Sequence, residues 1–351
     1  MNFKLKKIFL LNLWTLLICC TKDDTVNRGA NLFLGDNFPN KTIIVAGSTL
    51  NDGAVIWINN KKIKLIGDAL EATGIFYNNE IIYVTGWKYG GNGSLWTLNL
   101  DGTGQTHTEL EGKFSEGQRI VVHNEDTYVG GYFDQGSCYW KNGNKVNLTT
   151  NADSMSWGIG LDSNNNILNV GYYMKSHSLI PSFWTNNRRV NLSRPKHGDG
   201  EAKYIELSGN KKIIGGTVMS PHNFLGYITK PAYWVNGSRS TCPIGSLEDG
   251  WQNCDVFDLF VDNEENVFLG GFSQDMDSEY PTYWKNCEKF VIQNGEVPGV
   301  IRGIEVIDGK LVAAGTQSYF PGVPCVWIEG TQYIYDKDTI GEVWDMIVID
   351  N

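Results

Sequence analysis

A strand-like run that ends in glycine recurs seven times along the chain. The glycines are Gly47, Gly86, Gly131, Gly171, Gly216, Gly271 and Gly315, at intervals of 39, 45, 40, 45, 55 and 44 residues. A second run follows each of them and centres on a tryptophan: Trp57, Trp96, Trp140, Trp184, Trp234, Trp284 and Trp327. Self-similarity at such a period indicates a repeat architecture, in which each repeat is one supersecondary unit.

Each repeat has room for four short strands joined by tight turns. Most tryptophan runs continue into a turn such as Asn142-Gly143, a pair that favours the positive φ angles of a two-residue hairpin. Each glycine run also follows a short strand and a turn, as residues 120–122 precede residues 123–126. A four-stranded unit repeated radially is a β-propeller blade, so the sequence predicts an all-β, seven-bladed propeller.

The two ends of the chain predict how the ring closes. The first repeat begins directly with its glycine run at residues 41–47, whereas residues 342–350 form a strand with no repeat of their own. Placing strand 342–350 in the N-terminal blade completes seven blades and leaves no open sheet edge. A linear β-solenoid has no use for such a strand, and we expect residues 41–351 to form a single propeller domain.

The repeats resemble a known extracellular family. Their Tyr-Trp-x-Asn-Gly pattern is similar to the aromatic-x-Trp-x-x-Gly repeats named for a His-Ala-Phe motif, over nearly all of residues 31–351. The His-Ala-Phe triplet itself is absent, and other aromatic or aliphatic residues often replace the tyrosine. The resemblance therefore implies the fold and leaves the activity open.

The N-terminus carries an export signal. Three lysines within residues 4–7 precede the apolar run 8–18, which is too short for a permanent membrane span. The run ends at Cys19-Cys20, and Lys22-Asp23-Asp24 follow. This segment resembles a bacterial lipoprotein signal, which implies a signal peptide at 1–19, lipidation of Cys20 and a tether at 20–40. Lipidation of Cys19 and an ordinary cleaved signal peptide are the alternatives. The resemblance implies a lipid anchor in the outer membrane, facing the cell surface or the periplasm.

The net charge and the absence of known motifs exclude several classes of partner and cofactor. The net charge of −10 argues against nucleic acid, which demands basic surfaces. We find no phosphate loop, no nucleophile elbow and no histidines at a metal-ligand spacing. Asp162 and Asp262 begin segments that mimic the start of a calcium loop, but turn geometry alone also favours aspartate there. We therefore expect no metal, no cofactor and a monomeric domain.

Alignment of the seven predicted innermost strands defines a candidate site around the axis. Five of the seven residues at the first inward position are carboxylates: Glu71, Glu116, Glu201, Asp255 and Glu342. Two residues later the strands carry Thr73, Gln118, Trp157, Lys203, Phe257, Arg302 and Trp344. From these positions, the next position along each strand and the aromatic residue that follows Gly86, we predict the ligand contacts Trp87, Arg119, Trp157, Tyr204, Asp258, Arg302 and Trp344. Carboxylates that only bind backbone N–H groups of the crossing loops, or only solvent, are the alternative.

These residues predict a non-catalytic binding module that takes a glycan or a protein ligand on its loop-rich face. This is the rim where we expect the longer loops between the second and third strands of the repeats, such as Met174 to Pro181. Exposed aromatic rings suit sugars or peptides. A glycan hydrolase or lyase that uses the axial carboxylates is the main alternative, because paired carboxylates perform such chemistry. A scaffold within a larger membrane assembly is another.

Five cysteines lie beyond the signal. Cys242 and Cys254 flank a long crossing between two repeats, and we predict that they form a disulfide. Cys287, which replaces a turn glycine, is a competing partner. Cys138 and Cys325 occupy equivalent positions in two repeats and are expected to be buried.

Overall fold

The computed structural model describes residues 37–134, 136–149, 153–222, 226–244, 253–275, 278–292, 297–317, 322–335 and 339–351. The predicted signal peptide, Cys19 and Cys20 lie outside these residues. Within the described ranges, no helix is both long and apolar enough to cross a membrane.

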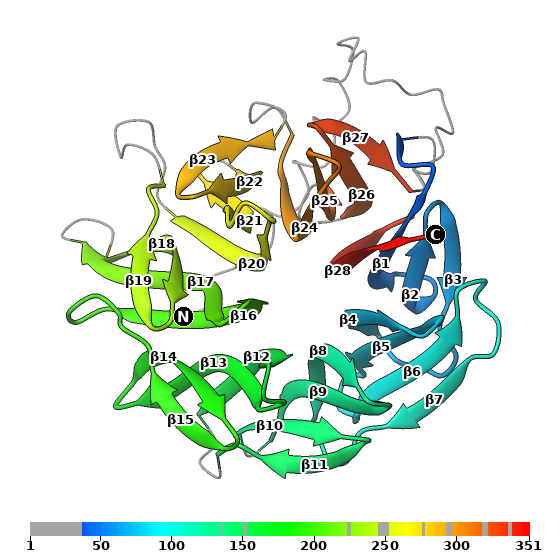
Figure 1. Cartoon of the computed structure of the whole chain (residues 1–351), viewed down its shortest axis with the longest axis horizontal. Coiled ribbons are helices and arrows are strands. Elements are labelled where there is room, and N and C mark those ends of the chain that lie inside the picture. The colour runs from blue at the N-terminus through cyan, green and yellow to red at the C-terminus, as the bar shows by residue number, and fades with distance from the viewer. Residues whose placement is uncertain are drawn as a thin grey trace, which may run out of the picture. The chain divides into compact units, whose positions relative to one another are not determined.

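The described residues form seven four-stranded antiparallel sheets, as the repeats predict (Figure 1). From the innermost strand outward, the first three blades are β28 (Gly341–Asp350), β1 (Lys41–Thr49), β2 (Gly53–Ile58) and β3 (Lys61–Lys64); β4 (Glu71–Asn78), β5 (Ile81–Trp87), β6 (Gly93–Asn99) and β7 (Thr106–Glu109); β8 (Glu116–His123), β9 (Asp126–Phe133), β10 (Gly136–Lys141) and β11 (Asn144–Asn147).

The next two blades are β12 (Ser154–Leu161), β13 (Ile167–Lys175), β14 (Ser178–Thr185) and β15 (Arg188–Asn191); β16 (Asp199–Ser208), β17 (Lys211–His222), β18 (Gly226–Val235) and β19 (Ser238–Thr241). The last two are β20 (Asn253–Val261), β21 (Val267–Gln274), β22 (Glu279–Lys285) and β23 (Glu288–Val291); β24 (Gly299–Ile307), β25 (Lys310–Gln317), β26 (Val323–Ile328) and β27 (Thr331–Ile334).

The ring closes through the C-terminal strand, as predicted. β28 pairs antiparallel with β1 over its whole length, from Gly341 opposite Thr49 to Asp350 opposite Lys41. The innermost strands contact one another in the cyclic order β28, β4, β8, β12, β16, β20, β24 and back to β28. Figure 1 shows these seven strands around the centre, so both ends of the sheet series meet in one blade.

The repeat tryptophans fill the space between neighbouring blades. Each is at most 1% exposed. Several also donate their indole N–H to a backbone carbonyl in the segment that crosses from the preceding blade, as Trp140 does to Glu111 (2.7 Å) and Trp234 does to Ser193 (2.8 Å). A tryptophan at this position therefore supplies both apolar area and a satisfied polar group.

The hairpin asparagines explain the turns after the tryptophans. Asn142 has a φ of 52° and Gly143 a φ of 80°, the pair of positive angles that a type I′ turn requires. The Asn142 side chain accepts a hydrogen bond from the Thr127 backbone N–H (2.8 Å), which fixes the turn to strand β9. Asn236 makes the same contact with Lys212 at 3.0 Å.

One expectation about loops needs correction. The segment from Met174 to Pro181 was expected to be a long loop, but β13 and β14 extend through it and pair up to Lys175 opposite Ser178. Only Ser176 and His177 form the turn, with φ angles of 50° and 65°. Pro181 does not end β14, because the pairing of β14 with β15 begins only at the next residue, Ser182 opposite Asn191.

Candidate functional site: the axial mouth

Every innermost strand contains a β-bulge at the same level of the ring. In β4, Ala72 pairs with Gly86 and Gly74 pairs with Thr85, so Thr73 has no partner. The equivalent register shifts occur in β8, β12, β16, β20 and β24, and at Asp345 and Val343 in β28. The unpaired residues are Thr73, Gln118, Trp157, Lys203, Phe257, Arg302 and Trp344. A bulge re-aims a side chain, and here it does so seven times around one axis.

The repeat glycine makes each bulge possible. A Cβ on Gly171 would lie 1.8 Å from the Met155 carbonyl oxygen, and a Cβ on Gly86 would lie 1.9 Å from that of Glu71. The other five repeat glycines meet the equivalent carbonyl at 1.9–2.1 Å. No side chain fits at such a distance, so the glycine of the sequence repeat and the bulge of the structure are one feature.

The seven bulge residues all line a single cavity of about 270 Å³, which we call the mouth. Its remaining lining residues are Glu71, Trp87, Glu116, Arg119 and Tyr132. The mouth lies where the innermost strands begin and the second strands end, since Glu71 pairs with Trp87 and Glu116 with Tyr132. It therefore opens on the face of the ring that carries the crossings between blades.

The cations of the mouth have partners within it. The Lys203 Nζ lies 2.5 Å from Asp255 Oδ2 and 3.7 Å from Glu201 Oε2. The Arg302 guanidinium stacks over the rings of Phe257 (3.7 Å to the centroid) and Trp344 (4.4 Å). Burial raises the pKa of Glu201, even though Lys203 opposes the shift.

The opposite sector of the mouth is acidic. Glu71 accepts a hydrogen bond from the Trp87 indole N–H (3.0 Å), and Glu116 accepts one from the Gln118 amide (3.3 Å). Burial and the neighbouring Glu342 raise the pKa of Glu71 to about 7, and burial also raises the pKa of Glu116. Carboxylates with raised pKa values in a cavity mark a candidate functional site.

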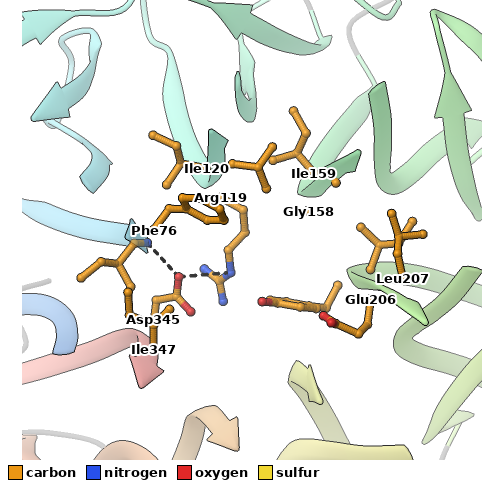
Figure 2. Close-up of a pocket in the computed structure, with 14 residues that line it drawn as sticks. Phe76, Arg119, Ile120, Gly158, Ile159, Glu206, Leu207, Asp345 and Ile347 are labelled. Carbon is orange, nitrogen blue, oxygen red and sulfur yellow. Dashed lines mark hydrogen bonds and ion pairs between the residues drawn. The ribbon is translucent and has the colours of Figure 1, made fainter. Parts of the chain in front are cut away.

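A second cavity of about 270 Å³, which we call the lower cavity, lies next to the mouth. Arg119 lines both cavities and so lies between them. Its Nη1 donates to the Thr73 carbonyl (2.5 Å) and its Nη2 to the Trp344 carbonyl (3.3 Å). Figure 2 shows the guanidinium facing the Asp345 carboxylate, with 3.7 Å between Nε and Oδ2. Leu207, Ile159 and other apolar side chains form most of the lower wall.

The structure brings most of the predicted contacts together. Five of the seven line the mouth: Trp87, Arg119, Trp157, Arg302 and Trp344. Tyr204 lines the lower cavity and faces Arg119, whose guanidinium carbon lies 5.6 Å from the ring centroid.

Asp258, the remaining predicted ligand contact, lines neither cavity and binds a backbone N–H group. It is 4% exposed, and its Oδ2 accepts the Ile304 backbone N–H at 2.7 Å. Asp345 does the same for Ile75 at 2.9 Å. These two aspartates join neighbouring innermost strands, which is the alternative role considered for axial acids.

The predicted axial carboxylates divide into two groups. Glu71 and Glu116 line the mouth, and the charge of Glu342 acts on Glu71. Glu201 and Asp255 hold Lys203. Lys203, Phe257, Thr73 and Gln118 also line the mouth but were not among the predicted contacts. Their alignment with Trp157, Arg302 and Trp344 is the signal that identifies them.

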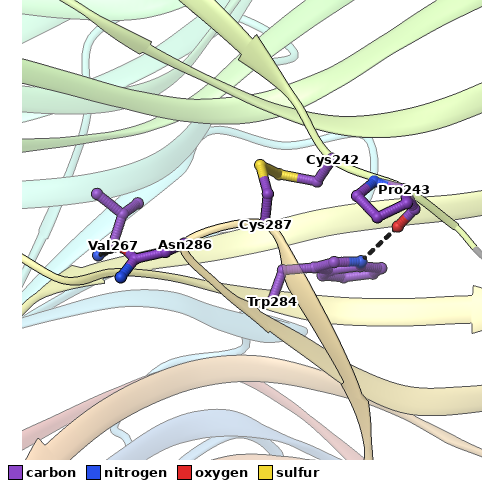
Figure 3. Close-up of a disulfide and its surroundings, with 6 residues drawn as sticks. All are labelled: Cys242, Pro243, Val267, Trp284, Asn286 and Cys287. Carbon is purple, nitrogen blue, oxygen red and sulfur yellow. Dashed lines mark hydrogen bonds between the residues drawn. A yellow bond between two sulfur atoms is a disulfide. The ribbon is translucent and has the colours of Figure 1, made fainter.

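The predicted disulfide is wrong. Cys242 pairs with Cys287 (Figure 3). Cys254 is a buried free thiol that donates to the Thr229 carbonyl (3.3 Å). The hairpin turn that contains Cys287 lies against the segment after β19, where the Trp284 indole N–H donates to the Pro243 carbonyl (3.0 Å). Packing between blades thus outweighs proximity in sequence.

The two calcium-like segments are turns. The Asp162 carboxylate accepts the backbone N–H groups of Asn164 (3.0 Å) and Asn166 (2.9 Å), and Asp262 repeats the pattern with Glu264 and Asn266. Among the residues that the structure describes, no group of three or more His, Cys, Asp or Glu side chains is placed to hold a metal ion.

The fold and its axial mouth define the chain as a seven-bladed β-propeller. No protein-family model and no curated protein matches the sequence. Among solved structures, the WD40 β-propeller domain of Doa1 superposes with a TM-score of 0.52 and 15% identity, over 82% of this chain and 93% of that one.

Two polysaccharide lyases also have similar folds. One, an ulvan lyase bound to -[GlcA(1-4)Rha3S]-, has a TM-score of 0.50 and 10% identity, over 85% of this chain and 86% of that one. The other, the polysaccharide lyase Uly1, has a TM-score of 0.46 and 11% identity, over 88% and 98%. At these identities the likeness to the Doa1 domain and the ulvan lyase shows the fold alone.

Proposed function

We propose that the protein is a non-catalytic binding module that takes a glycan or protein ligand in the mouth. The observation that carries the proposal is the set of seven bulges, which aim seven side chains into one cavity. Three of these side chains, Trp157, Phe257 and Trp344, are aromatic, and Trp87 adds a fourth ring. Aromatic faces stack on sugar rings and attract cations, while nearby polar groups fix the orientation of the ligand.

Unpaired indole groups support the same proposal. The Nε1 atoms of Trp157 and Trp344 are buried and have no hydrogen-bond partner among the described residues. An unsatisfied buried donor costs about 1–3 kcal/mol. A ligand oxygen that reaches these donors after a small side-chain rotation would recover that free energy.

The location belongs to the proposal as well. The sequence supports export, lipidation of Cys20 and an outer-membrane anchor that faces the cell surface, with the periplasm as the alternative. We further propose a monomeric propeller without nucleic-acid partners, since the chain has a net charge of −10. Mass spectrometry of the N-terminal peptide tests the lipidation, and protease treatment of whole cells tests the exposure.

A thermal-shift screen of the whole chain tests the binding. Oligosaccharides and short peptides form separate arms, and a ligand at 100 times its Kd adds ~2.7 kcal/mol of stability. The proposal predicts that Trp157→Ala abolishes the shift and that Phe290→Ala, on outer strand β23, retains it. A ligand that stabilises both variants equally would show that binding occurs elsewhere.

A second candidate function is a glycan hydrolase or lyase. The observation that favours it is Glu71, whose pKa of about 7 suits general acid–base chemistry near neutral pH. Product analysis of any stabilising glycan separates the two functions. An enzyme releases products and loses turnover in Glu71→Gln while it still binds, whereas a binding module releases none.

A further inference from the structure

Exposed apolar side chains gather on the mouth face of three adjacent blades. In the described part of the chain, the large apolar side chains with high exposure there include Leu50 (76%), Leu70 (43%), Tyr89 (81%), Phe114 (60%) and Ile340 (39%), while Ile66 (46%) lies in the same crossing as Leu70, next to outer strand β3. All five belong to loops or crossings at the outer border of the mouth, in the blades whose innermost strands are β28, β4 and β8. We call this set the apolar rim.

The first part of the rim is continuous. The Leu50 N–H donates to the Ile340 carbonyl (2.9 Å), so these two residues are neighbours. The Ala54 N–H donates to the Ala69 carbonyl (3.1 Å), which holds the loop that contains Leu50 against the crossing before β4. Leu70 is the next residue of that crossing.

The rim then continues across the second blade. The Leu70 N–H donates to the carbonyl of Trp87, a residue of the mouth, at 3.0 Å. Tyr89 follows two residues later in the same loop. The end of that loop is bound to the next crossing, because the Gly93 N–H donates to Ser115 Oγ (2.8 Å) beside Phe114. The five side chains therefore form an arc around one side of the mouth.

This arc borders the acidic sector. Leu70 precedes Glu71 directly, while Phe114 and Ile340 each lie two residues before a carboxylate, Glu116 and Glu342. The lining of the mouth carries the carboxylates Glu71 and Glu116 and the cations Arg119, Lys203 and Arg302, and its border adds Glu201, Asp255 and Glu342. Glu201 and Asp255 hold Lys203, and Asp345 faces Arg119, so of these three cations Arg302 remains to balance Glu71, Glu116 and Glu342. The balance favours a positively charged ligand group.

We propose that a segment of a protein partner inserts a lysine or arginine side chain into the mouth, against Glu71, Glu116 and Glu342, and packs its flanking apolar side chains on the apolar rim. This inference rests on the proposed binding function and names its ligand. The mouth is smaller than the roughly 300–1,000 Å³ of pockets that hold drug-sized ligands, so one long side chain suits it. Trp87 and Tyr132 supply aromatic faces that attract a cation.

The rim favours a protein over a glycan. Leu50, Leu70 and Ile340 have no hydrogen-bonding groups and no ring faces for a polyhydroxylated ligand. They match the aliphatic and aromatic side chains of a peptide, and clustered exposed apolar residues beside a polar cavity are typical of protein–protein contacts.

The mouth also implies a pH dependence. In the protein without ligand, the pKa of Glu71 is raised to about 7 by its burial and by the charges of Glu342 and Glu116. The Trp87 N–H and Arg302 oppose this rise. A cationic side chain binds the ionised form, so its affinity for the mouth increases between pH 6 and pH 8.

The test is a selection of short random peptides on the immobilised whole chain, followed by titration of the probe Ac-Leu-Arg-Leu-NH2. We expect the selected peptides to share a lysine or arginine flanked by apolar residues. Glu71→Gln keeps an acceptor for the Trp87 N–H and should weaken the probe at least ~10-fold. Glu288→Gln, on the exposed face of β23, is the control and should change the affinity less than ~2-fold.

A second pair of variants tests the contribution of the apolar rim. Leu70→Ser should weaken the probe several-fold, whereas Val190→Ser should not, although the two side chains are 43% and 41% exposed. Melting temperatures of all variants verify folding. Selected peptides without basic residues, or a probe that binds Glu71→Gln as tightly as the parent, would overturn the inference.

Comparing oligosaccharides with peptides as ligands distinguishes a failure of this inference from a failure of the proposed function. If oligosaccharides bind the mouth and the peptides do not, the binding function stands and the basic partner segment is wrong. If neither class binds, or if binding is indifferent to Glu71 and Trp157, both are wrong.

Discussion

Replacing a repeat glycine by alanine should cost far more than replacing another strand glycine of the same blade. Gly171, on β13, faces the bulge of β12, and its new Cβ would lie 1.8 Å from the Met155 carbonyl oxygen and 3.0 Å from the Ser156 Cα. Both contacts are backbone atoms that no rotamer change can move. Gly160, on β12, is the control, since its Cβ would meet only the Ile205 side chain at 3.3 Å and Leu207 at 3.9 Å.

The magnitudes follow from these contacts. Overpacking costs typically 1–3 kcal/mol, and a clash with fixed backbone belongs at the upper end, so we expect Gly171→Ala to destabilise by ~3 kcal/mol. Gly160→Ala should change stability by less than ~1 kcal/mol, because alanine also restricts the unfolded chain. With ~2.1 cal/mol/K of unfolding entropy per residue over roughly 300 residues, ~3 kcal/mol lowers the Tm by ~5 °C.

Scanning calorimetry on the two variants measures the difference. We expect the Tm to fall by several degrees in Gly171→Ala and to change by less than ~2 °C in Gly160→Ala. Equal melting temperatures would refute the argument that the repeat glycine is required by the bulge. Loss of ligand binding in Gly171→Ala at a temperature where the protein is folded would link the bulge to the mouth.

Three further outcomes are expected. Trp284→Phe should cost ~1 kcal/mol more than Trp327→Phe in urea unfolding, because both rings are buried but only Trp284 donates to a carbonyl, and the Trp327 Nε1 has no partner among the described residues. Reducing the disulfide between Cys242 and Cys287, which spans 45 residues, should lower the free energy of unfolding by ~4 kcal/mol on loop-entropy grounds. The Cys287→Ser variant, which has no such disulfide to reduce, is the control and should not respond to the reductant. Glu71→Gln should raise the Tm more at pH 8 than at pH 5. The folded-state pKa of about 7 exceeds the ordinary 4.5, so the folded protein retains a proton that the unfolded chain releases, and the parent loses stability as the pH rises through this window.

The fold could be predicted because each blade repeats its two most constrained residues. The glycine is fixed by contact with a carbonyl and the tryptophan by burial between blades, so both recur at each repeat. The unpaired strand 342–350 predicted the closure for the same reason, since a propeller leaves no blade incomplete.

The site could be predicted only in part. Aligning the inner strands placed Trp157, Arg302 and Trp344 at one level, but the glycine that marks each bulge lies on the neighbouring strand and does not tell which inner-strand side chain turns into the mouth. The alignment therefore did not distinguish a side chain aimed into the mouth from Asp258, which bonds to the next strand. Pairing of Cys242 with Cys287 depends on how adjacent blades pack, which spacing along the chain does not encode.

Fluorine NMR of the whole chain labelled with 5-fluorotryptophan reveals whether a ligand binds in the mouth. The chain has 12 tryptophans, of which Trp87, Trp157 and Trp344 line the mouth, while the seven repeat tryptophans are buried between blades. Resonances are assigned by Trp→Phe variants, and Ac-Leu-Arg-Leu-NH2 and the most stabilising oligosaccharide are added in turn. We expect shifts at the three mouth tryptophans, with the resonances of the repeat tryptophans unchanged. A bound ligand that leaves those three resonances in place would contradict it.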